Sequence, residues 1–249
     1  MAIGSAFPVW IVLLLVAPFI GSFLGVVVVR QCEGVILGRS RCDACGHALD
    51  WRDLVPLVSW LALRGRCRHC GARVGAFHPL IELAAIAPVL WAATRYSGGL
   101  LAASTILGWL LLALALIDWR TQRLPDVLNL LLALAGLATA WLFDRANVVD
   151  HLIGAAAGFA ALAAVGATYR KLRGREGLGL GDAKLLGALG AWLSWVVLPP
   201  LVLLAALLAL GFAVARSLVK GRESLEQRIA FGPFLAAAGW ILWLYGPRP

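Results

Sequence analysis

Long apolar runs separated by short polar segments dominate the chain. A run needs roughly 20 residues to cross the hydrocarbon core of a bilayer, and about 17 is the short limit. Eight runs are candidate membrane spans, at residues 8–29, 80–97, 100–117, 126–143, 152–169, 183–195, 197–215 and 231–246. Because the run at 183–195 is short, its division from the next one rests on Pro199 and Pro200. We therefore expect eight spans, with seven as the alternative.

The composition favours a membrane protein over a soluble one. Hydrophobic residues make up 61% of the chain and charged residues only 14%, whereas a soluble domain carries roughly 25% charged residues. No basic segment precedes the first apolar run, which exceeds the roughly 7–15 residues of a signal peptide. The sequence thus predicts an all-α integral membrane protein that retains its first helix, within residues 1–29, and has the lipid bilayer as a partner.

The positions of the basic residues predict the orientation in the membrane. The loop 30–79 carries eight arginines against four acidic residues. If this loop faces the cytoplasm, eight spans put all but three of the 22 basic residues on the cytoplasmic side, the exceptions being Arg95, Arg145 and Arg248. The positive-inside rule fits this threading and fails for its inverse. Both chain ends should then face away from the cytoplasm.

The formal net charge of +9 would also suit a nucleic-acid-binding protein. However, acidic residues balance part of the charge in the loop 30–79, and no aromatic platform for stacking bases is interleaved with its arginines. We therefore ascribe the charge to cytoplasmic loops of a membrane protein and expect no nucleic acid partner.

Two matching cysteine pairs lie in the loop 30–79. They are Cys42-Asp-Ala-Cys45-Gly and Cys67-Arg-His-Cys70-Gly, separated by 21 residues. Two such pairs can hold one tetrahedral Zn²⁺, with a glycine easing each turn, and a reducing cytoplasm disfavours disulfides. His47 and His69 are neighbouring alternative ligands, but the symmetric pairing favours an all-cysteine site. With no position left open, we expect a structural metal that supplies folding energy to a small loop.

Two aspartates lie at the ends of apolar spans. Ionisable side chains are costly in spans and mark functional sites by default. Asp118 ends the third span and Asp182 opens the sixth, so the threading above puts both at the cytoplasmic membrane edge. Two carboxyls that meet there share a proton and titrate as a pair. The ionised one can activate water while the neutral one protonates the carbonyl oxygen or the leaving amine. This pattern indicates peptide hydrolysis without a metal.

Glycines precede the second aspartate. Gly177, Gly179 and Gly181 alternate just before a helix, where missing side chains leave room for a substrate strand. A flexible loop followed by Asp182 as a helix N-cap would show the same pattern. The presence of Asp118 at the same membrane edge favours a functional role for Asp182 over a role as a helix cap alone.

Three further charged residues lie at or near the ends of the apolar runs, and their patterns allow more than one role. Asp126 competes with Asp118 for the first carboxyl role, but its position after Leu-Pro is more typical of a helix start. Lys184 points to a different side of the helix from Asp182 and can snorkel to the interface. Glu82 can pair with an arginine of the cytoplasmic loop or bind a substrate amine.

Several motifs in sequence order resemble the bifunctional type IV prepilin peptidases, and the resemblance covers nearly the whole chain. The motifs are Gly21-Ser-Phe-Leu24, Pro56-Leu-Val-Ser-Trp-Leu61 between the cysteine pairs, His78-Pro-Leu-Ile-Glu82, Asp118 with Leu124-Pro-Asp126, Gly179-Leu-Gly-Asp182 with Lys184, and Phe231-Gly-Pro-Phe234. One departure is Gly25, which stands where the family usually has asparagine.

The resemblance implies a division of labour along the chain. After the helix in 1–29, residues 30–79 would form the zinc module and methyltransferase region, and 80–249 the peptidase. Asp118 and Asp182 would be the catalytic aspartates. The substrates would be type IV prepilins or pseudopilins, with a short basic leader, a glycine and an apolar helix, cut at the cytoplasmic face of the bacterial inner membrane. Substrate contacts are expected at Gly179, Gly181, Lys184 and Glu82.

Methylation of the new N-terminus from S-adenosylmethionine is implied by the resemblance alone. No Gly-x-Gly-x-x-Gly motif follows a strand, and the loop 30–79 is too short for a Rossmann domain. Glu82 is the candidate residue for binding this methyl donor.

Other functions would share some of these features. A preflagellin peptidase or a presenilin-like protease would use the same aspartyl chemistry but not the paired cysteines. A non-enzymatic membrane scaffold or transporter with a structural zinc module would tolerate loss of Asp118, and its polar groups should lie near the bilayer midplane.

Overall fold

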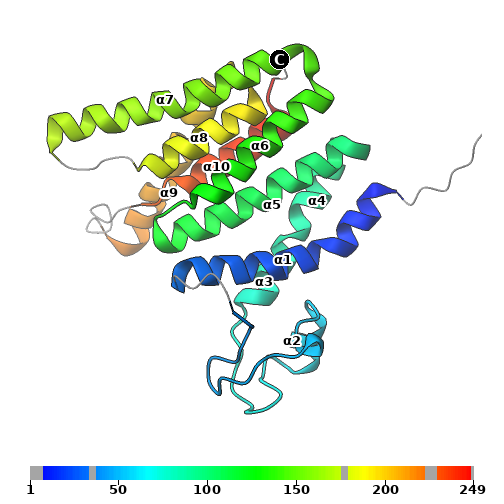
Figure 1. Cartoon of the computed structure of the whole chain (residues 1–249). Helices are drawn as coiled ribbons and strands as arrows, with labels where there is room; N and C mark the ends of the chain where they lie inside the picture. Colours follow the sequence, from blue (N-terminus) through cyan, green and yellow to red (C-terminus); the bar gives the residue numbers. More distant parts are fainter. Residues whose placement is uncertain (1–7, 34–37, 175–178, 222–228, 248–249) are drawn as a thin grey trace, which may run out of the picture. The chain divides into compact units, whose positions relative to one another are not determined.

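The computed structural model describes residues 8–33, 38–174, 179–221 and 229–247, and every regular element in them is a helix (Figure 1). The chain divides into two compact units, Met1–Trp109 and Leu110–Pro249. In chain order, the elements are α1 (Val9–Glu33), η1 (Trp51–Asp53), α2 (Val58–Ala62), α3 (Phe77–Ala84), α4 (Ile86–Ala93), α5 (Gly98–Thr121), α6 (Asp126–Phe143), η2 (Arg145–Asn147), α7 (Val148–Arg173), α8 (Leu180–Leu193), α9 (Leu198–Lys220) and α10 (Gly232–Tyr245).

The helices confirm the predicted all-α membrane fold. Five helical stretches of the described residues are long and apolar enough to cross a membrane, namely Val9–Gln31, Gly98–Thr121, Asp126–Phe143, Arg145–Arg173 and Leu198–Lys220. Shorter apolar helices cover Phe77–Ala93 and Gly232–Tyr245. Each of the eight predicted runs therefore lies largely within its own helix or helix pair.

The short run at 183–195 corresponds to α8, a helix of 14 residues. It ends at Ser194, which has φ 65 and a fully buried side chain. Backbone in this left-handed region cannot continue an α-helix. The helical path resumes only at Leu198, so α8 and α9 are separate and the division into eight runs holds.

The predicted span 80–97 is interrupted, because α3 ends at Ala84 and α4 begins at Ile86. Pro88 has no N–H to donate to the carbonyl of Ala84, so the helical hydrogen bond expected there cannot form. The indole Nε1 of Trp109 donates to the carbonyl of the next residue, Ala85, at 2.8 Å. The interruption thus coincides with the hydrogen bond that proline removes, and a side chain of α5 binds the backbone beside it.

In the second unit, α8 forms the core. It packs against α6, α7 and α10 (Figure 1), and its side chains are buried almost continuously from Ala183 to Leu193. The contact between α7 and α8 depends on missing side chains. A Cβ atom at Gly154 would lie 2.5 Å from the carbonyl oxygen of Gly190, and one at Gly158 would lie 2.8 Å from that of Leu186. This close packing fixes the helix that carries Asp182.

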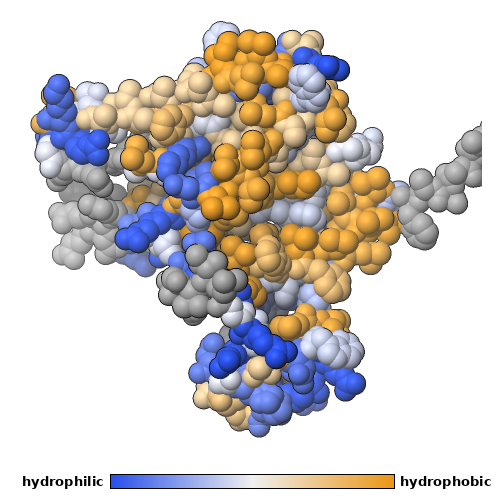
Figure 2. All heavy atoms as spheres, in the orientation of Figure 1, coloured by the Kyte–Doolittle hydropathy of each residue, from blue (hydrophilic) through white to orange (hydrophobic). Residues whose placement is uncertain are grey.

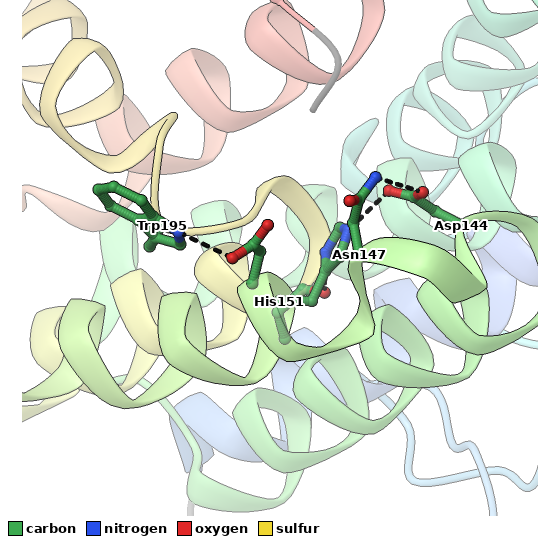
Figure 3. Close-up of polar contacts among 6 residues, drawn as sticks. Asp144, Asn147, His151 and Trp195 are labelled. Carbon is green, nitrogen blue, oxygen red and sulfur yellow. Dashed lines mark hydrogen bonds and ion pairs between the residues drawn. The ribbon is translucent and has the colours of Figure 1, made fainter.

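A polar cluster ties the α6–α7 connection to the end of α8 (Figure 3). The His151 ring lies with Nδ1 3.1 Å from the carbonyl oxygen of Ala191 and Nε2 3.2 Å from Asp144 Oδ2. Trp195 Nε1 donates to Asp150 Oδ1 at 3.0 Å. The cluster closes the core where α8 ends.

In the first unit, α1 packs against α3 and α4. A Cβ atom at Gly21 would lie 2.6 Å from the Cα of Glu82, so only glycine allows this approach. One at Gly25 would lie 2.9 Å from His78 Nδ1, which means that the His78 ring lies against this position. Figure 2 shows hydrophobic residues over the helices and hydrophilic ones gathered on the cysteine-containing segment.

Candidate active site and metal site

Asp118 lies in the last turn of α5 and is only 4% exposed. Its Oδ2 accepts a hydrogen bond of 2.9 Å from the backbone N–H of Gly232, the first residue of α10. The unpaired N–H groups at a helix N-terminus carry partial positive charge and favour an anion. The start of α10 therefore holds one oxygen of Asp118 in a fixed position.

Gly232 has to be glycine for this arrangement. A Cβ atom at Gly232 would lie 2.6 Å from Asp118 Oδ2 and 3.0 Å from its Cγ. Sequence reasoning quoted Phe231-Gly-Pro-Phe234 as a motif but gave it no role. A Gly-Pro pair at a helix start, where proline is well tolerated, was the available signal.

Asp182 lies in the first turn of α8. The N-cap of this helix is Gly179, so the reading of Asp182 as the N-cap is wrong; it is the third helical residue. Its carboxylate is hydrogen-bonded by the backbone N–H of Gly179, as in one half of a capping box. The charge of Asp118 acts on the Asp182 carboxyl. The second unit thus brings these two carboxyls, from α5 and α8, within electrostatic range.

The glycines around Asp182 have different surroundings. A Cβ atom at Gly181 would lie 3.1 Å from the Leu124 side chain, so this glycine lets the α5–α6 connection approach α8. Among the described residues, a Cβ atom at the exposed Gly179 would meet only Asp182 Oδ2, at 3.6 Å, and the Gly181 nitrogen, at 3.8 Å. Gly177 lies outside the described residues.

Lys184 and Asp126 form an ion pair of 2.6 Å between Nζ and Oδ1. Asp126 is the first residue of α6 after the N-cap Pro125, and its side chain is 74% exposed. Since Asp118 is buried and Asp126 is exposed, the two carboxyls that competed in the sequence have different environments.

Asn129 is a buried polar residue that sequence reasoning did not single out. It lies on the buried face of α6, and neither its Oδ1 nor its Nδ2 has a hydrogen-bond partner in the described structure. Its position inside an apolar run was the available signal.

Glu82 belongs to the first unit and is 5% exposed. Its Oε2 accepts a 2.7 Å hydrogen bond from the backbone N–H of Leu57, which has φ 60. The carboxylate therefore anchors a strained turn of the segment between the cysteine pairs to α3.

The four cysteines converge as predicted. The sulfurs of Cys42, Cys45, Cys67 and Cys70 lie within 4.8 Å of one another. The Cys42–Cys70 distance is 3.8 Å, close to the edge of a tetrahedron with Zn–S bonds of about 2.3 Å. Gly46 and Gly71 both have φ +70, which confirms their role in the turns. The chemistry and spacing of these donors fit a structural metal ion.

Backbone groups of the second pair also favour a metal-binding thiolate. N–H groups of Cys70 and His69 lower the pKa of Cys67 to about 7. The His47 and His69 rings stack at 3.5 Å, and the metal-binding group found in the described residues contains cysteines only.

An ion pair joins η1 to the second cysteine pair. Arg68 Nε donates to Asp53 Oδ1 at 2.8 Å, and this bond holds the pKa of Asp53 below its usual range. The stability that the pair contributes is present above the unfolded pKa of about 3.9 and is lost as the pH falls through the lower folded value.

The chain was compared with known proteins. Two family models match it: Bacterial Peptidase A24 N-terminal domain over residues 15–96 and Type IV leader peptidase family over residues 105–214. Three relatives share the name Prepilin leader peptidase/N-methyltransferase. The Aeromonas salmonicida protein is 41% identical over 85% of this chain and 73% of its own; the values are 40%, 96% and 94% for Dickeya chrysanthemi and 40%, 86% and 74% for Pseudomonas aeruginosa. No solved structure matches the chain.

Proposed function

The chain belongs to the type IV leader peptidase family, and on this basis we propose that it cleaves the leader peptides of type IV prepilins or pseudopilins. The observation that carries the proposal is the approach of two carboxyls, Asp118 and Asp182, at the ends of two helices of one unit. The hydrogen bond from Gly232 to Asp118 supports a preset geometry. Preset groups cost no reorganisation when the reaction occurs.

In the proposed reaction, the two aspartates act as an acid–base pair. One ionised carboxyl removes a proton from water, and the resulting hydroxyl adds to the carbonyl carbon of the scissile peptide bond. The other, protonated carboxyl donates its proton to the carbonyl oxygen, which gives a tetrahedral diol. As the C–N bond breaks, the first carboxyl gives the leaving amine the proton that it took from water, and the second carboxyl takes a proton back from the diol as the new carboxyl group forms. Two carboxyls that interact closely share one proton at neutral pH, which supplies both forms at once.

Residues near the pair are proposed to position the substrate. Gly179 is exposed next to Asp182 and leaves space for an extended peptide. Gly181 admits Leu124 to the same end of α8. Lys184 is proposed to bind the substrate by exchanging its ion-pair partner Asp126 for a group of the substrate. Glu82 is proposed separately as a substrate contact of the first unit.

The membrane setting of the reaction follows from the charge distribution. The many apolar helices make the chain a membrane protein. We place it in the bacterial inner membrane with the aspartates at the cytoplasmic face, because that orientation keeps most basic residues inside. Water and the basic leader are both available there.

The cysteine cluster is proposed to bind zinc in a structural role. Four sulfurs fill a tetrahedral shell and leave no open position for a reacting water. The four cysteines would hold the ion and thereby order the segment between α1 and α3.

N-methylation of the new N-terminus is proposed as a second activity from the relatives' names. S-adenosylmethionine would supply the methyl group. The carboxylate of Glu82, the sequence candidate for binding this donor, already accepts a hydrogen bond from the backbone N–H of Leu57.

Mass spectrometry tests both activities in one assay. The purified protein in lipid nanodiscs is incubated with a prepilin, with and without S-adenosylmethionine. We expect loss of the leader under both conditions and a methylated product only with the donor. A prepilin that stays intact after incubation with folded protein would contradict the peptidase proposal. Cleavage without methylation would contradict the second activity alone.

A further inference from the structure

A cavity of about 590 Å³ lies beside the Asp118 end of α5, and the chemistry above gives it no role. Its walls come from the end of α5, the last turns of α9 and the residues before α10, and include Trp119, Phe212, Ala215, Arg216, Lys220 and Ile229. The walls are mostly apolar or aromatic, with two cations on α9.

Ring contacts connect this cavity to the elements that hold the aspartates. Trp119 directly follows Asp118, and its ring packs edge-on against Phe212 with centroids 5.4 Å apart. On its other side, Phe212 contacts Phe234 at 5.6 Å. Phe234 lies two residues after Gly232, the donor to Asp118. The cavity therefore takes part of its wall from the end of α5, and Phe212 connects it to the start of α10; these two helix ends position the first carboxyl.

We propose that this cavity is the subsite for the start of the substrate's apolar segment, on the C-terminal side of the scissile bond. The inference rests on the proposed function and identifies which part of the prepilin binds there. Burial of large apolar side chains is favourable, and a cavity of this size next to Asp118 can take more than one of them.

The charges on α9 indicate which side of the scissile bond occupies the cavity. Arg216 and Lys220 are one helical turn apart on α9 and both line the cavity. A basic leader would meet like charges here, which disfavours its binding. The apolar segment meets no such penalty, so the leader must leave in another direction.

The surface of α9 gives the apolar segment a route to the cavity. Large apolar side chains on this helix are exposed from Leu203 through Leu207 and Leu210 to Val214, in a stretch that fits a membrane span. A substrate helix embedded in the bilayer can therefore approach along α9. It reaches the cavity near the cations at the end of α9 without leaving the membrane.

Filling the cavity tests the proposal. Ala215→Phe places a ring in it, whereas Ala160→Phe adds the same ring to an exposed α7 position that does not line it. With prepilin in nanodiscs, we expect Ala215→Phe to lower kcat/KM at least about tenfold, since pocket changes of this kind alter discrimination by roughly 10–200-fold. Ala160→Phe should cleave like the native protein, and both variants should keep the native melting temperature.

A substrate series separates a lost subsite from general damage. Prepilins in which the first large apolar residue after the scissile bond is replaced by alanine should be cleaved more slowly by the native protein. The same replacement should cost Ala215→Phe much less, because that variant has already lost the contact. Independent effects of the two changes, or native cleavage by Ala215→Phe, would overturn the proposal.

Charge reversal tests the opposite assignment. We expect Lys220→Glu to leave the preference between a basic and a neutral leader unchanged. If Lys220→Glu instead favours the basic leader, the cavity binds the leader and the proposal is wrong. Failure of the native protein to cleave any prepilin would count against the proposed function itself. The two failures are distinguishable, because the native protein tests the function and the variants test the subsite.

Discussion

At the scale of single residues, the pairing of Asp118 with the Gly232 N–H is the detail that defines the candidate active site. The hydrogen bond needs a helix that starts beside the carboxylate and a residue without a side chain at that start. Both conditions are met by one Gly-Pro step at the beginning of α10. The site is thus built from three separate helices, α5, α8 and α10.

Gly232→Ala should impair cleavage more than folding. The new Cβ would lie 2.6 Å from Asp118 Oδ2, so the carboxylate or the helix start must shift. We expect kcat to fall about tenfold or more, since displacement of a catalytic group by about 1 Å can cost 10²-fold.

Gly211→Ala is the matched control, because a Cβ atom there has no neighbour within 4 Å. Kinetics on prepilin and thermal melting of both variants check the prediction. Native kcat in Gly232→Ala would show that the close approach does not matter for the reaction.

Single residues also show what sequence could and could not predict about the site. Asp118 and Asp182 stood out because carboxyls are rare in apolar runs, and their approach fits that reading. The partner Gly232 was unforeseen, because its contact spans 114 residues and depends on how α10 packs. Asn129 was missed because a single amide disturbs a hydropathy pattern very little.

At the scale of helices, close packing of α7 on α8 sets the position of Asp182. Gly154, Gly158, Gly187 and Gly190 all lie at points where a side chain would meet backbone of the other helix. Small residues let helix backbones approach closely in membranes. A substitution at this contact should therefore shift the start of α8, where Asp182 lies.

Gly154→Ala is predicted to destabilise the second unit and slow cleavage. Its Cβ would lie 2.5 Å from the Gly190 carbonyl oxygen, which belongs to backbone and cannot rotate away. Overpacking of this kind costs about 1–3 kcal/mol. Thermal melting in detergent, with Gly211→Ala as control, should show a lower midpoint for Gly154→Ala. An unchanged melting midpoint would contradict the prediction, because it would mean that the α7–α8 contact accommodates the new methyl group without loss of stability.

Helix positions followed from the sequence better than helix ends. All eight apolar runs became helices, because continuous apolarity over such lengths leaves few alternatives in lipid. The interruption at Ala85 was not predicted, although Pro88 was visible in the run. The depth of burial of α8 was also not foreseen, since it comes from packing by three neighbouring helices.

At the scale of the whole molecule, apolar helices and one hydrophilic cysteine segment perform different tasks. The segment has little apolar core of its own, so we expect its order to depend on a bound metal and on ties such as Asp53–Arg68. The predicted cysteine site agrees with the geometry because Cys-x-x-Cys pairs constrain their sulfurs locally. The predicted division at residues 29 and 79 stays a prediction.

Zinc removal should loosen the cysteine segment selectively. We expect about one zinc ion per chain by metal analysis, consistent with one four-cysteine shell. A strong chelator, or Cys45→Ser with Cys70→Ser, should expose arginines between residues 39 and 73 to trypsin while the helical signal in circular dichroism persists. Protein that lacks zinc as purified, or that resists trypsin equally after chelation, would contradict this role.

The central claim is that Asp118 and Asp182 form the catalytic pair, and single asparagine substitutions test it most directly. Asparagine keeps size and polarity but cannot complete the acid–base cycle. Asp118→Asn, Asp182→Asn and the control Asp126→Asn are compared for prepilin cleavage in membranes, with accumulation and zinc content measured for each. We predict that the first two abolish cleavage and the control retains it. Normal cleavage by either of the first two, or loss only in Asp126→Asn, would contradict the account.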